Sequence, residues 1–331
     1  MESRPPLPGA DTSMRIAGPA IIDEVPPMTL RAEIAALPPS QRLVDSGAFH
    51  VYWARADQIR SVLREIGRLR ELTFRAVGEG TGRCADIDAF DAYYLHLFVW
   101  DTRQDAIAGA YRLGLVDEIQ ARHGQRGLYT RSLFRYGPAL LDMLNPAIEL
   151  GRSFVRVEYQ RSFTPLMLLW CGIGRFIVRS PRYTVLFGPV TISGRYARES
   201  RRLMVDYLSR HRADAHLVSL VSPRRPFRDG AATSALGVND PTPGKIDELS
   251  RRIAQIEPDG KGVPVLLRHY LRLGGRLLGF SVDVQFGNAL DGLIMVDVRQ
   301  IEPAVLERYM GKAGSAAFRG YHAAHAAGST M

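Results

Sequence analysis

The sequence predicts an α/β protein built around one central mixed β-sheet with helices on its faces. Short β-rich segments alternate with segments of helical periodicity along most of the chain. Hydrophobic residues make up 46% of the 331 residues and charged residues 23%, which is the balance of an ordinary globular protein with a sizeable core. The interleaving of strands and helices favours a single sheet domain over separate all-α and all-β units.

The first half of the pattern consists of a strand, a helix and a hairpin. Residues 48–54 are rich in aromatic and β-branched residues and predict a strand. A helix is expected from about Asp57, because apolar residues then recur at helical spacing: Ile59, Val62, Leu63, Ile66 and Leu69. Residues 93–100 and 106–115 are β-rich on either side of the polar segment 101–105, which predicts a hairpin.

The second half repeats strand–helix units and closes with a helix and two strands. The predicted segments, in order, are strand 148–157, an apolar helix ending near 177, strand 183–192, helix 198–211, helix 263–273, and strands 276–286 and 290–298. Residues 223–261 are polar and contain several prolines, so we expect an irregular insertion there. The domain is expected to span residues 41–310, between a flexible Pro-rich arm (1–40) and a flexible Ala/Gly-rich tail (311–331).

Composition argues against several classes of protein. The longest apolar run, residues 163–178, is interrupted by Arg175 and is too short to span a membrane. No secretory signal is visible at the N-terminus, so a cytoplasmic location is expected. Cys84 and Cys171 are far apart and lack a CxxC spacing, which argues against a disulfide scaffold and a metal site.

The positive charge is concentrated in one stretch of the chain. The net charge is +9, and residues 149–212 contain twelve Arg, no Lys and four acidic residues. Such a stretch is either a solvated surface or a binding surface for an acidic partner. Arginine forms fork-like contacts with phosphate, so a ligand that carries phosphate would suit it.

Three segments resemble the acyl-homoserine lactone synthases and the N-acyl amino acid synthases. They are the Asp-x-x-Asp of residues 88–91, the Arg of 109–113 and the Glu-x-x-Arg of 149–152. The match to the ornithine lipid branch rests on four segments: 149–153 (ELGRS), 186–193 (LFGPVTIS), 262–268 (GVPVLLR) and 291–297 (DGLIMVD). The resemblance spans roughly residues 49–310. It implies a GNAT-like fold with an extended C-terminal part. The implied reaction is transfer of a 3-hydroxy fatty acyl group to the α-amine of an amino acid. L-ornithine is the first expected acceptor, and glycine or another amine is the alternative.

The resemblance also suggests roles on the acceptor side. Glu149 would face the acceptor as a catalytic base, with burial raising its pKa; the alternative is that Glu149 only pairs with Arg112 or Arg152 to hold the strands. The two arginines would support it or bind a substrate carboxylate, with Ser153 among the substrate-binding residues. Asp88 and Asp91 would hold an ammonium group, or else act as a cap.

The donor side of the resemblance points to acyl carrier protein. GNAT proteins bind pantetheine pyrophosphate at a glycine-rich turn that opens a helix, but residues 160–165 contain no glycine. We therefore expect a carrier-bound phosphopantetheine thioester as the donor and no separate cofactor. Backbone amides at a bulge near Phe154 and Val155 would stabilise the oxyanion. The phosphate would be bound by Arg156 and Arg161, and the carrier by a second group: Arg198, Arg201 and Arg202.

Other functions are less consistent with the sequence. No nucleic-acid-binding motif is evident despite the charge, so we expect no nucleic-acid partner. Loose contact of the arginine-rich face with an anionic membrane remains compatible with a lipid product, so an inner-membrane-peripheral location is an alternative. A covalent intermediate on a cysteine is disfavoured because no histidine lies near Cys84 or Cys171. Tyr196 and Tyr207 are candidates to protonate the leaving thiolate.

Overall fold

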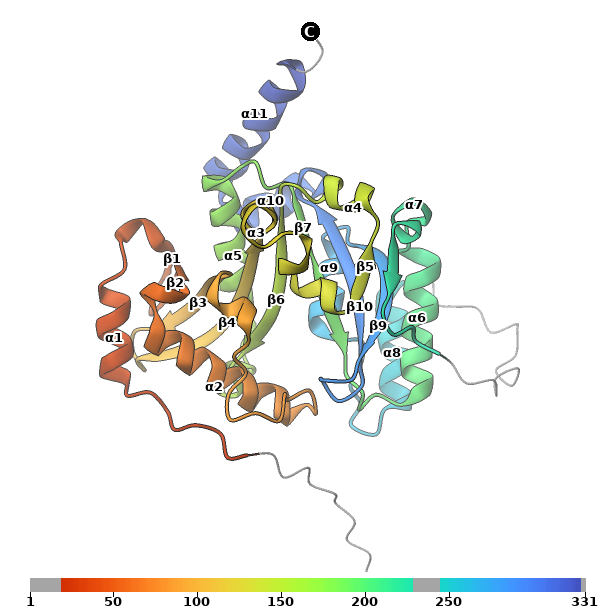
Figure 1. Cartoon of the computed structure of the whole chain (residues 1–331), viewed down its shortest axis with the longest axis horizontal. Coiled ribbons are helices and arrows are strands. Elements are labelled where there is room, and N and C mark those ends of the chain that lie inside the picture. Colours follow the sequence, from red (N-terminus) through yellow and green to blue (C-terminus); the bar gives the residue numbers. More distant parts are fainter. Residues whose placement is uncertain (1–18, 229–244, 329–331) are drawn as a thin grey trace, which may run out of the picture.

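The computed structural model describes residues 19–228 and 245–328, and it confirms a mixed α/β fold. Eight strands form one sheet in the order β1–β2–β3–β4–β6–β7–β10–β9 (Figure 1). In that order their bounds are Arg42–Ser46, Phe49–Arg55, Leu95–Asp101, Ala106–Leu115, Ala147–Val155, Val185–Ile192, Ala289–Asp297 and Arg276–Asp283. Neighbouring strands are antiparallel except for β6 and β7, which are parallel. A separate two-stranded sheet pairs β5 (Phe134–Tyr136) with β8 (Val221–Pro223).

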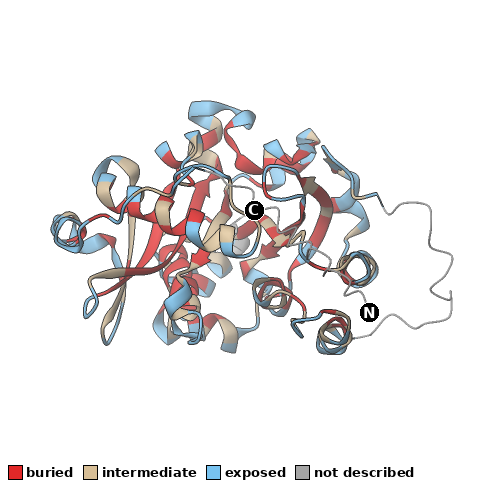
Figure 2. Cartoon of the chain, turned by 90° about the horizontal axis from the view of Figure 1, so that it is seen from below, coloured by how far each residue is buried: buried red, intermediate tan, exposed pale blue. Residues whose placement is uncertain are grey.

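Helices cover both faces of the large sheet, and its central strands are therefore buried (Figure 2). Every residue of β3 is buried, as expected of a strand covered on both sides. On one face α5 (Thr164–Arg179) and α9 (Val265–Arg272) pack against the sheet, and α10 (Pro303–Met310) packs against α5. On the other face lies α2 (Arg60–Ala76), whose buried Val62, Ile66 and Leu69 recur at helical spacing.

Seven further α-helices lie within the described residues. They are α1 (Pro27–Ala35), α3 (Val116–His123), α4 (Pro138–Met143), α6 (Arg198–His211), α7 (Ala215–Ser219), α8 (Ile246–Ile256) and α11 (Lys312–Gly328). The side chains of α3, α4 and α7 form a second buried cluster with one face of β7 and β10. The helix α6 packs against α8 beside the β9 edge of the sheet.

The parallel pair β6–β7 opens soon after it forms. Residues 147–149 pair with residues 185–187, and beyond Glu149 the two strands pair only with their outer neighbours, β4 and β10. A bulge accompanies the opening, because Arg152 and Ser153 both lie opposite Tyr111 of β4. Arg152 has a φ of 50°, a left-handed backbone conformation that is uncommon outside glycine. The middle of the sheet therefore contains a gap between two diverging strands.

The ends of the chain are more ordered than the sequence suggested. Part of the expected flexible arm forms α1, whose Leu30 and Ile34 are buried against α2. The expected flexible tail forms α11, and Phe318 in it is fully buried. The Pro, Ala and Gly content of these segments favours flexibility, but a few well-placed apolar residues suffice to dock a helix. The expected insertion contains α8, and its residues 229–244 lie outside the described residues.

Candidate active site

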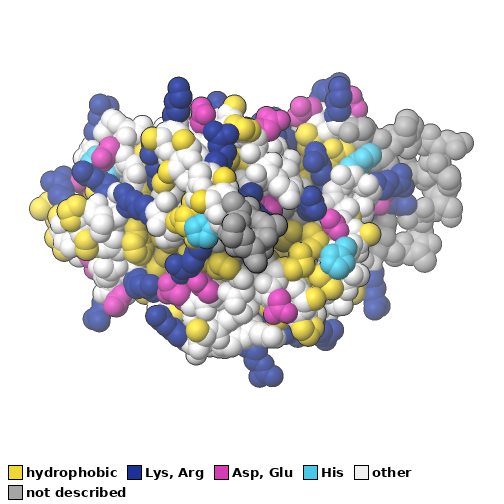
Figure 3. All heavy atoms as spheres, turned by 90° about the horizontal axis from the view of Figure 1, so that it is seen from above, with side chains coloured by type: hydrophobic (Ala, Val, Ile, Leu, Met, Phe, Trp, Pro, Cys, Tyr) yellow, Lys and Arg dark blue, Asp and Glu magenta, His cyan; other side chains and the backbone are white. Residues whose placement is uncertain are grey.

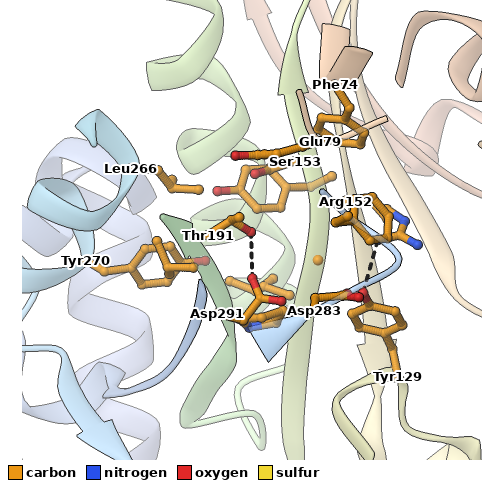
Figure 4. Close-up of a pocket in the computed structure, with 16 residues that line it drawn as sticks. Phe74, Glu79, Tyr129, Arg152, Ser153, Thr191, Leu266, Tyr270, Asp283 and Asp291 are labelled. Carbon is orange, nitrogen blue, oxygen red and sulfur yellow. Dashed lines mark hydrogen bonds between the residues drawn. The ribbon is translucent and has the colours of Figure 1, made fainter. Parts of the chain in front are cut away.

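A cavity of about 170 Å³ occupies the gap between β6 and β7. Leu150, Gly151, Arg152 and Ser153 of β6 form one wall, and Pro189, Val190 and Thr191 of β7 form the facing wall. The remaining lining residues come from β4, α9, the β9–β10 hairpin and the segments around α2 and Tyr129: Phe74, Glu79, Tyr111, Tyr129, Leu266, Tyr270, Asp283, Phe286 and Asp291. Figure 4 shows these side chains converging from both halves of the sheet.

The bulge in β6 lies inside this cavity. A bulge removes residues from the regular hydrogen-bonded ladder, so backbone groups at Arg152 and Ser153 are directed differently from those of their neighbours. The bulge that is expected near Phe154 and Val155 lies two residues earlier, at Arg152 and Ser153. Phe154 and Val155 pair regularly with β4, and the Phe154 side chain is buried in the core beside α2.

Glu149 lies beneath the cavity and does not line it. Its side chain is 1% exposed and accepts hydrogen bonds from the Tyr94 hydroxyl and from the backbone N–H groups of Tyr129 (3.0 Å) and Thr130 (2.7 Å). Burial raises the pKa of Glu149, and the hydrogen bonds from Thr130 and Tyr94 oppose that shift without cancelling it. Among the described residues it forms no ion pair with Arg112 or Arg152. The expected exposure to an acceptor is therefore wrong, and so is the alternative ion pair.

Asp88, Asp91 and Arg112 belong to a buried ionic network. Asp91 accepts two hydrogen bonds from Arg70, both at 3.0 Å, and lies 3.3 Å from Arg112. Although burial opposes it, the neighbouring Arg70 and Arg112 hold the pKa of Asp91 well below its usual range. Asp88 caps the short helix that follows it and accepts a hydrogen bond from Arg112 Nη1 at 2.6 Å. These groups are occupied by one another, so a cap and a structural ion network describe them better than an ammonium site.

Arg152 joins this network to the cavity. Its guanidinium lies 3.1 Å from Asp86 and 3.3 Å from Asp88, and it donates to the Tyr129 hydroxyl at 3.1 Å. The same group stacks over the Phe286 ring, 4.3 Å from the ring centroid. The network thus fixes the side chain of the residue whose backbone forms the bulge. Among the predicted acceptor-side residues, Arg152 and Ser153 do line the cavity, whereas Asp88, Asp91, Arg112 and Glu149 do not.

Three carboxylates in the cavity were not predicted as site residues. Asp291 lies in β10 and its Oδ1 accepts a hydrogen bond from the Thr191 hydroxyl at 2.7 Å. Burial raises the pKa of Asp291 to about 7, and burial likewise raises the pKa of Glu79 to about 7. The third carboxylate is Asp283, at the end of β9. A charged residue inside the apolar strand 290–298 was the available signal for Asp291, but nothing in the sequence indicates that Glu79 and Asp283 reach the same cavity.

The predicted donor-side arginines lie at the edge where the cavity strands end. Because β6 and β7 are parallel, their C-terminal ends, and hence the starts of α5 and α6, lie at the same edge of the sheet. Arg156 follows β6 and pairs with Glu158 at 3.0 Å, whereas Arg161 is exposed just before α5. In α6, Arg198 is exposed and Arg201 and Arg202 are half-buried. The structure therefore brings the two predicted groups of arginines to one edge.

The remaining reactive side chains lie elsewhere. Tyr196 donates a hydrogen bond to the Gly262 carbonyl and Tyr207 is 2% exposed, and neither lines the cavity. Cys171 lies on α5, away from the cavity, and burial raises the pKa of its thiol. Within residues 19–228 and 245–328, no three His, Cys, Asp or Glu side chains are grouped so that they could hold a metal ion. No helix in the same part of the chain has the length and hydrophobicity that crossing a membrane requires.

Comparison with known proteins identifies the family. Residues 69–170, which include β3, β4 and β6, match the family model described as an acetyltransferase (GNAT) domain. The chain is 32% identical to a glycine N(alpha)-acyltransferase of Phocaeicola vulgatus over 257 residues, which is 73% of this chain and 77% of that protein. It is 31% identical to a glycine N(alpha)-acyltransferase of Bacteroides thetaiotaomicron, over 78% of this chain and 80% of the relative. It is also 27% identical to an L-ornithine N(alpha)-acyltransferase of Rhizobium meliloti, over 74% of this chain and 78% of the relative.

Proposed function

Because this chain belongs to the GNAT-type N-acyltransferases, we propose that it transfers a fatty acyl group from acyl carrier protein to the α-amine of a small amino acid. The observation that carries the proposal is the cavity between the diverging strands β6 and β7, with a bulge on one wall. Such a gap lets an acyl thioester approach from one side of the sheet and an amine from the other.

The cavity provides what acyl transfer to an amine requires. The thioester carbonyl develops negative charge when the amine attacks, and preorganised N–H donors stabilise that charge. Backbone groups at Arg152 and Ser153 are the candidates, because the bulge turns them out of the ladder. Leu266, Phe286 and Phe74 make part of the wall apolar, which excludes water and strengthens each polar contact inside.

Two features favour acyl carrier protein as the donor. The segment before α5 contains no glycine between Arg156 and Thr164, so it lacks the turn that suits a pyrophosphate. The carrier's phosphopantetheine arm has a single phosphate, for which Arg161, exposed just before α5, is the candidate. The acidic surface of a carrier protein would complement the arginines at the starts of α5 and α6.

Glycine is the first acceptor to test, because two relatives named for glycine are 32% and 31% identical over most of their length. Ornithine is the second, and a specific observation favours it. Three carboxylates line the cavity, whereas its one arginine already contacts Asp86 and Asp88. That charge balance suits an acceptor with a second ammonium group better than one with a single amine.

The test follows free thiol release from long-chain 3-hydroxyacyl carrier protein, with glycine, ornithine and other amino acids as acceptors. Products are identified by mass spectrometry, and the matching coenzyme A thioester is run in parallel. We expect rapid release only with carrier-bound donor and one preferred amino acid. Thiol release that does not depend on any amine would contradict the proposed acceptor. Equal rates with the coenzyme A thioester would contradict the proposed donor.

A cavity-filling variant ties the activity to this site. A side chain at Gly151 would project into open space at the cavity wall, so Gly151→Leu is expected to fill the cavity without straining the fold. We expect at least a tenfold loss in kcat/KM for the acceptor with unchanged thermal unfolding. Gly320→Leu is the matched control, because Gly320 also faces open space but lies on α11. Normal turnover by Gly151→Leu would show that the reaction takes place outside this cavity.

A further inference from the structure

Asp291 is held in a fixed position inside the cavity. It lies in β10, between β7 and the edge strand β9, directly opposite Thr191 of β7, so the two side chains share one face of neighbouring strands. The Thr191 hydroxyl donates to Oδ1 at 2.7 Å, and no described residue hydrogen-bonds to Oδ2. Figure 4 shows the Thr191–Asp291 pair in the cavity, with Asp283 beside it toward Tyr129. One carboxylate oxygen is therefore anchored and the other is available to a bound molecule.

Three charged groups and one neutral hydroxyl group, from four segments of the chain, face Asp291. Asp283 of β9 and Glu79, which follows α2, are negative, Arg152 of β6 is positive, and Thr191 of β7 is neutral. Burial raises the pKa of Asp291 to about 7, the hydrogen bond from Thr191 opposes this rise, and Asp283 and Glu79 add to it. A carboxyl group with a pKa near 7 can both accept and release a proton at neutral pH.

A second feature of the cavity wall points to a bound molecule. Tyr111 is 2% exposed and lines the same cavity. Its polar neighbours are Ser153 and Tyr270, but none of the described residues gives it a hydrogen bond of ordinary geometry. Buried hydroxyl groups normally have a partner, and a molecule bound in the cavity would supply one for Tyr111.

We propose that Asp291 accepts the proton that the acceptor ammonium must lose before its nitrogen attacks the thioester; the inference rests on the proposed N-acyl transfer. The ammonium gives one proton to Oδ2 and becomes a neutral amine. Its lone pair forms the C–N bond at the carbonyl carbon, and the carbonyl becomes an oxyanion. When the C–S bond breaks, the second nitrogen proton goes to the departing sulfur, which leaves as a free thiol. Asp291 then releases its proton to water, so one proton is produced per amide formed.

The other carboxylates suit this role less well. Glu149 lies outside the cavity and its oxygens already accept three hydrogen bonds. Asp283 Oδ1 accepts from the backbone N–H of Gln285 at 2.9 Å, as expected of a residue that ends a strand. Glu79 is half-buried on the segment after α2, where its position depends on a connecting loop. Asp291 alone combines a strand position, a free oxygen and an orienting hydroxyl.

The test is the pH dependence of kcat/KM in four proteins. In the native chain, activity is expected to rise with pH through an acidic limb near pH 7. Asp291→Asn keeps the shape but cannot accept a proton, so kcat should fall by about 10²–10³-fold and the limb should disappear. Thr191→Val removes a hydrogen bond that lowers the pKa, so the limb should move to higher pH. Asp283→Asn removes a charge that raises the pKa, so the limb should move to lower pH.

The outcomes separate this inference from the proposed function. If the native chain releases thiol with no amino acid, the proposed function fails. If the native chain is active and Asp291→Asn keeps its rate and its acidic limb, only the role of Asp291 is overturned. Should Asp291→Asn not fold, the opposite shifts in Thr191→Val and Asp283→Asn decide; limbs that stay in place in both would overturn the inference.

Discussion

Glu149 accepts three hydrogen bonds from residues of two different segments, and one donor, the backbone of Tyr129, belongs to a residue that lines the cavity. The carboxylate thus connects β6 to the segment around residues 128–130 and to Tyr94, which precedes β3. Its geometry suits a residue that positions the wall of the site. The effect of a Glu149 substitution on catalysis then depends on how far the substitution moves that wall.

We expect Glu149→Gln to cost about 1–3 kcal/mol of unfolding free energy. An amide has one acceptor oxygen in place of two, so its NH₂ group would face either the Tyr129 or the Thr130 N–H, and one buried donor would lose its partner. Chemical denaturation measures the loss. Turnover per folded molecule should fall much less than in Asp291→Asn. Unchanged stability together with a loss of more than a hundredfold in kcat would show that Glu149 takes part in the reaction itself.

At the residue scale, the sequence located part of the site and missed its acidic part. The motif at 149–153 is local, and two of its residues, Arg152 and Ser153, line the cavity. Glu149 and Arg152 both contact Tyr129, but Arg152 lies at the bulge beyond the point where β6 and β7 separate, and it therefore lines the cavity whereas Glu149 does not. Glu79, Asp283 and Asp291 come from three distant segments, and only the sheet order β7–β10–β9 brings two of them together.

At the scale of elements, the divergence of β6 and β7 creates the site. Gly188 of β7 lies so close to β6 that a Cβ atom there would overlap the Leu150 carbonyl oxygen. Because Gly188 carries no side chain, the strands can stay paired up to Glu149 and Phe187, directly before they separate. Hydrophobic pattern predicted both strands, but it contains no information on where a parallel pair opens or where a bulge shifts the register.

Gly188→Ala is expected to push β6 away from β7. The added methyl group would meet backbone atoms, which cannot move aside as a side chain could, so a stability loss of about 1–3 kcal/mol is expected. Because Ser153 and Thr191 form opposite walls, activity should fall even at temperatures where the variant is folded. Gly279→Ala in β9 is the control, since its methyl group would meet only Phe134 at 3.8 Å. Equal effects of the two substitutions would show that the spacing at Gly188 has no special role.

Terminal elements were harder to predict than central ones. The strands β3, β4, β6, β7, β9 and β10 were expected within a few residues of their observed bounds, because each has a sustained apolar or alternating pattern. The helices α1 and α11 have weak patterns and depend on tertiary contacts such as that of the buried Phe318. Local composition therefore predicts such helices poorly, because a docked side chain provides their stabilisation.

At the scale of the whole molecule, the excess of positive charge alone does not identify a docking face. Figure 3 shows the end from which α11 projects, where Lys and Arg side chains are spread over the surface among Asp and Glu. The opposite edge of the sheet differs because the two cavity strands, β6 and β7, end there. The parallel arrangement of β6 and β7 places the starts of α5 and α6 there, with the exposed Arg161 and Arg198. A carrier that binds at this edge would present its thioester arm to the gap in the sheet.

Charge reversal at this edge tests carrier docking. We expect Arg161→Glu combined with Arg198→Glu to raise KM for acyl carrier protein at least tenfold, because each reversal replaces an attraction with a repulsion toward an acidic partner. KM for the amino acid and the midpoint of thermal unfolding should stay nearly unchanged. The effect should shrink as salt rises from 0.05 to 0.5 M in roughly the manner of any screened surface interaction. Arg319→Glu on α11 changes the net charge at the other end of the molecule and should leave KM for the carrier near its native value. Suppose that Arg319→Glu raised KM for the carrier as much, per reversed charge, as the double variant does. The effect would then come from long-range attraction by the total charge and not from a defined docking edge.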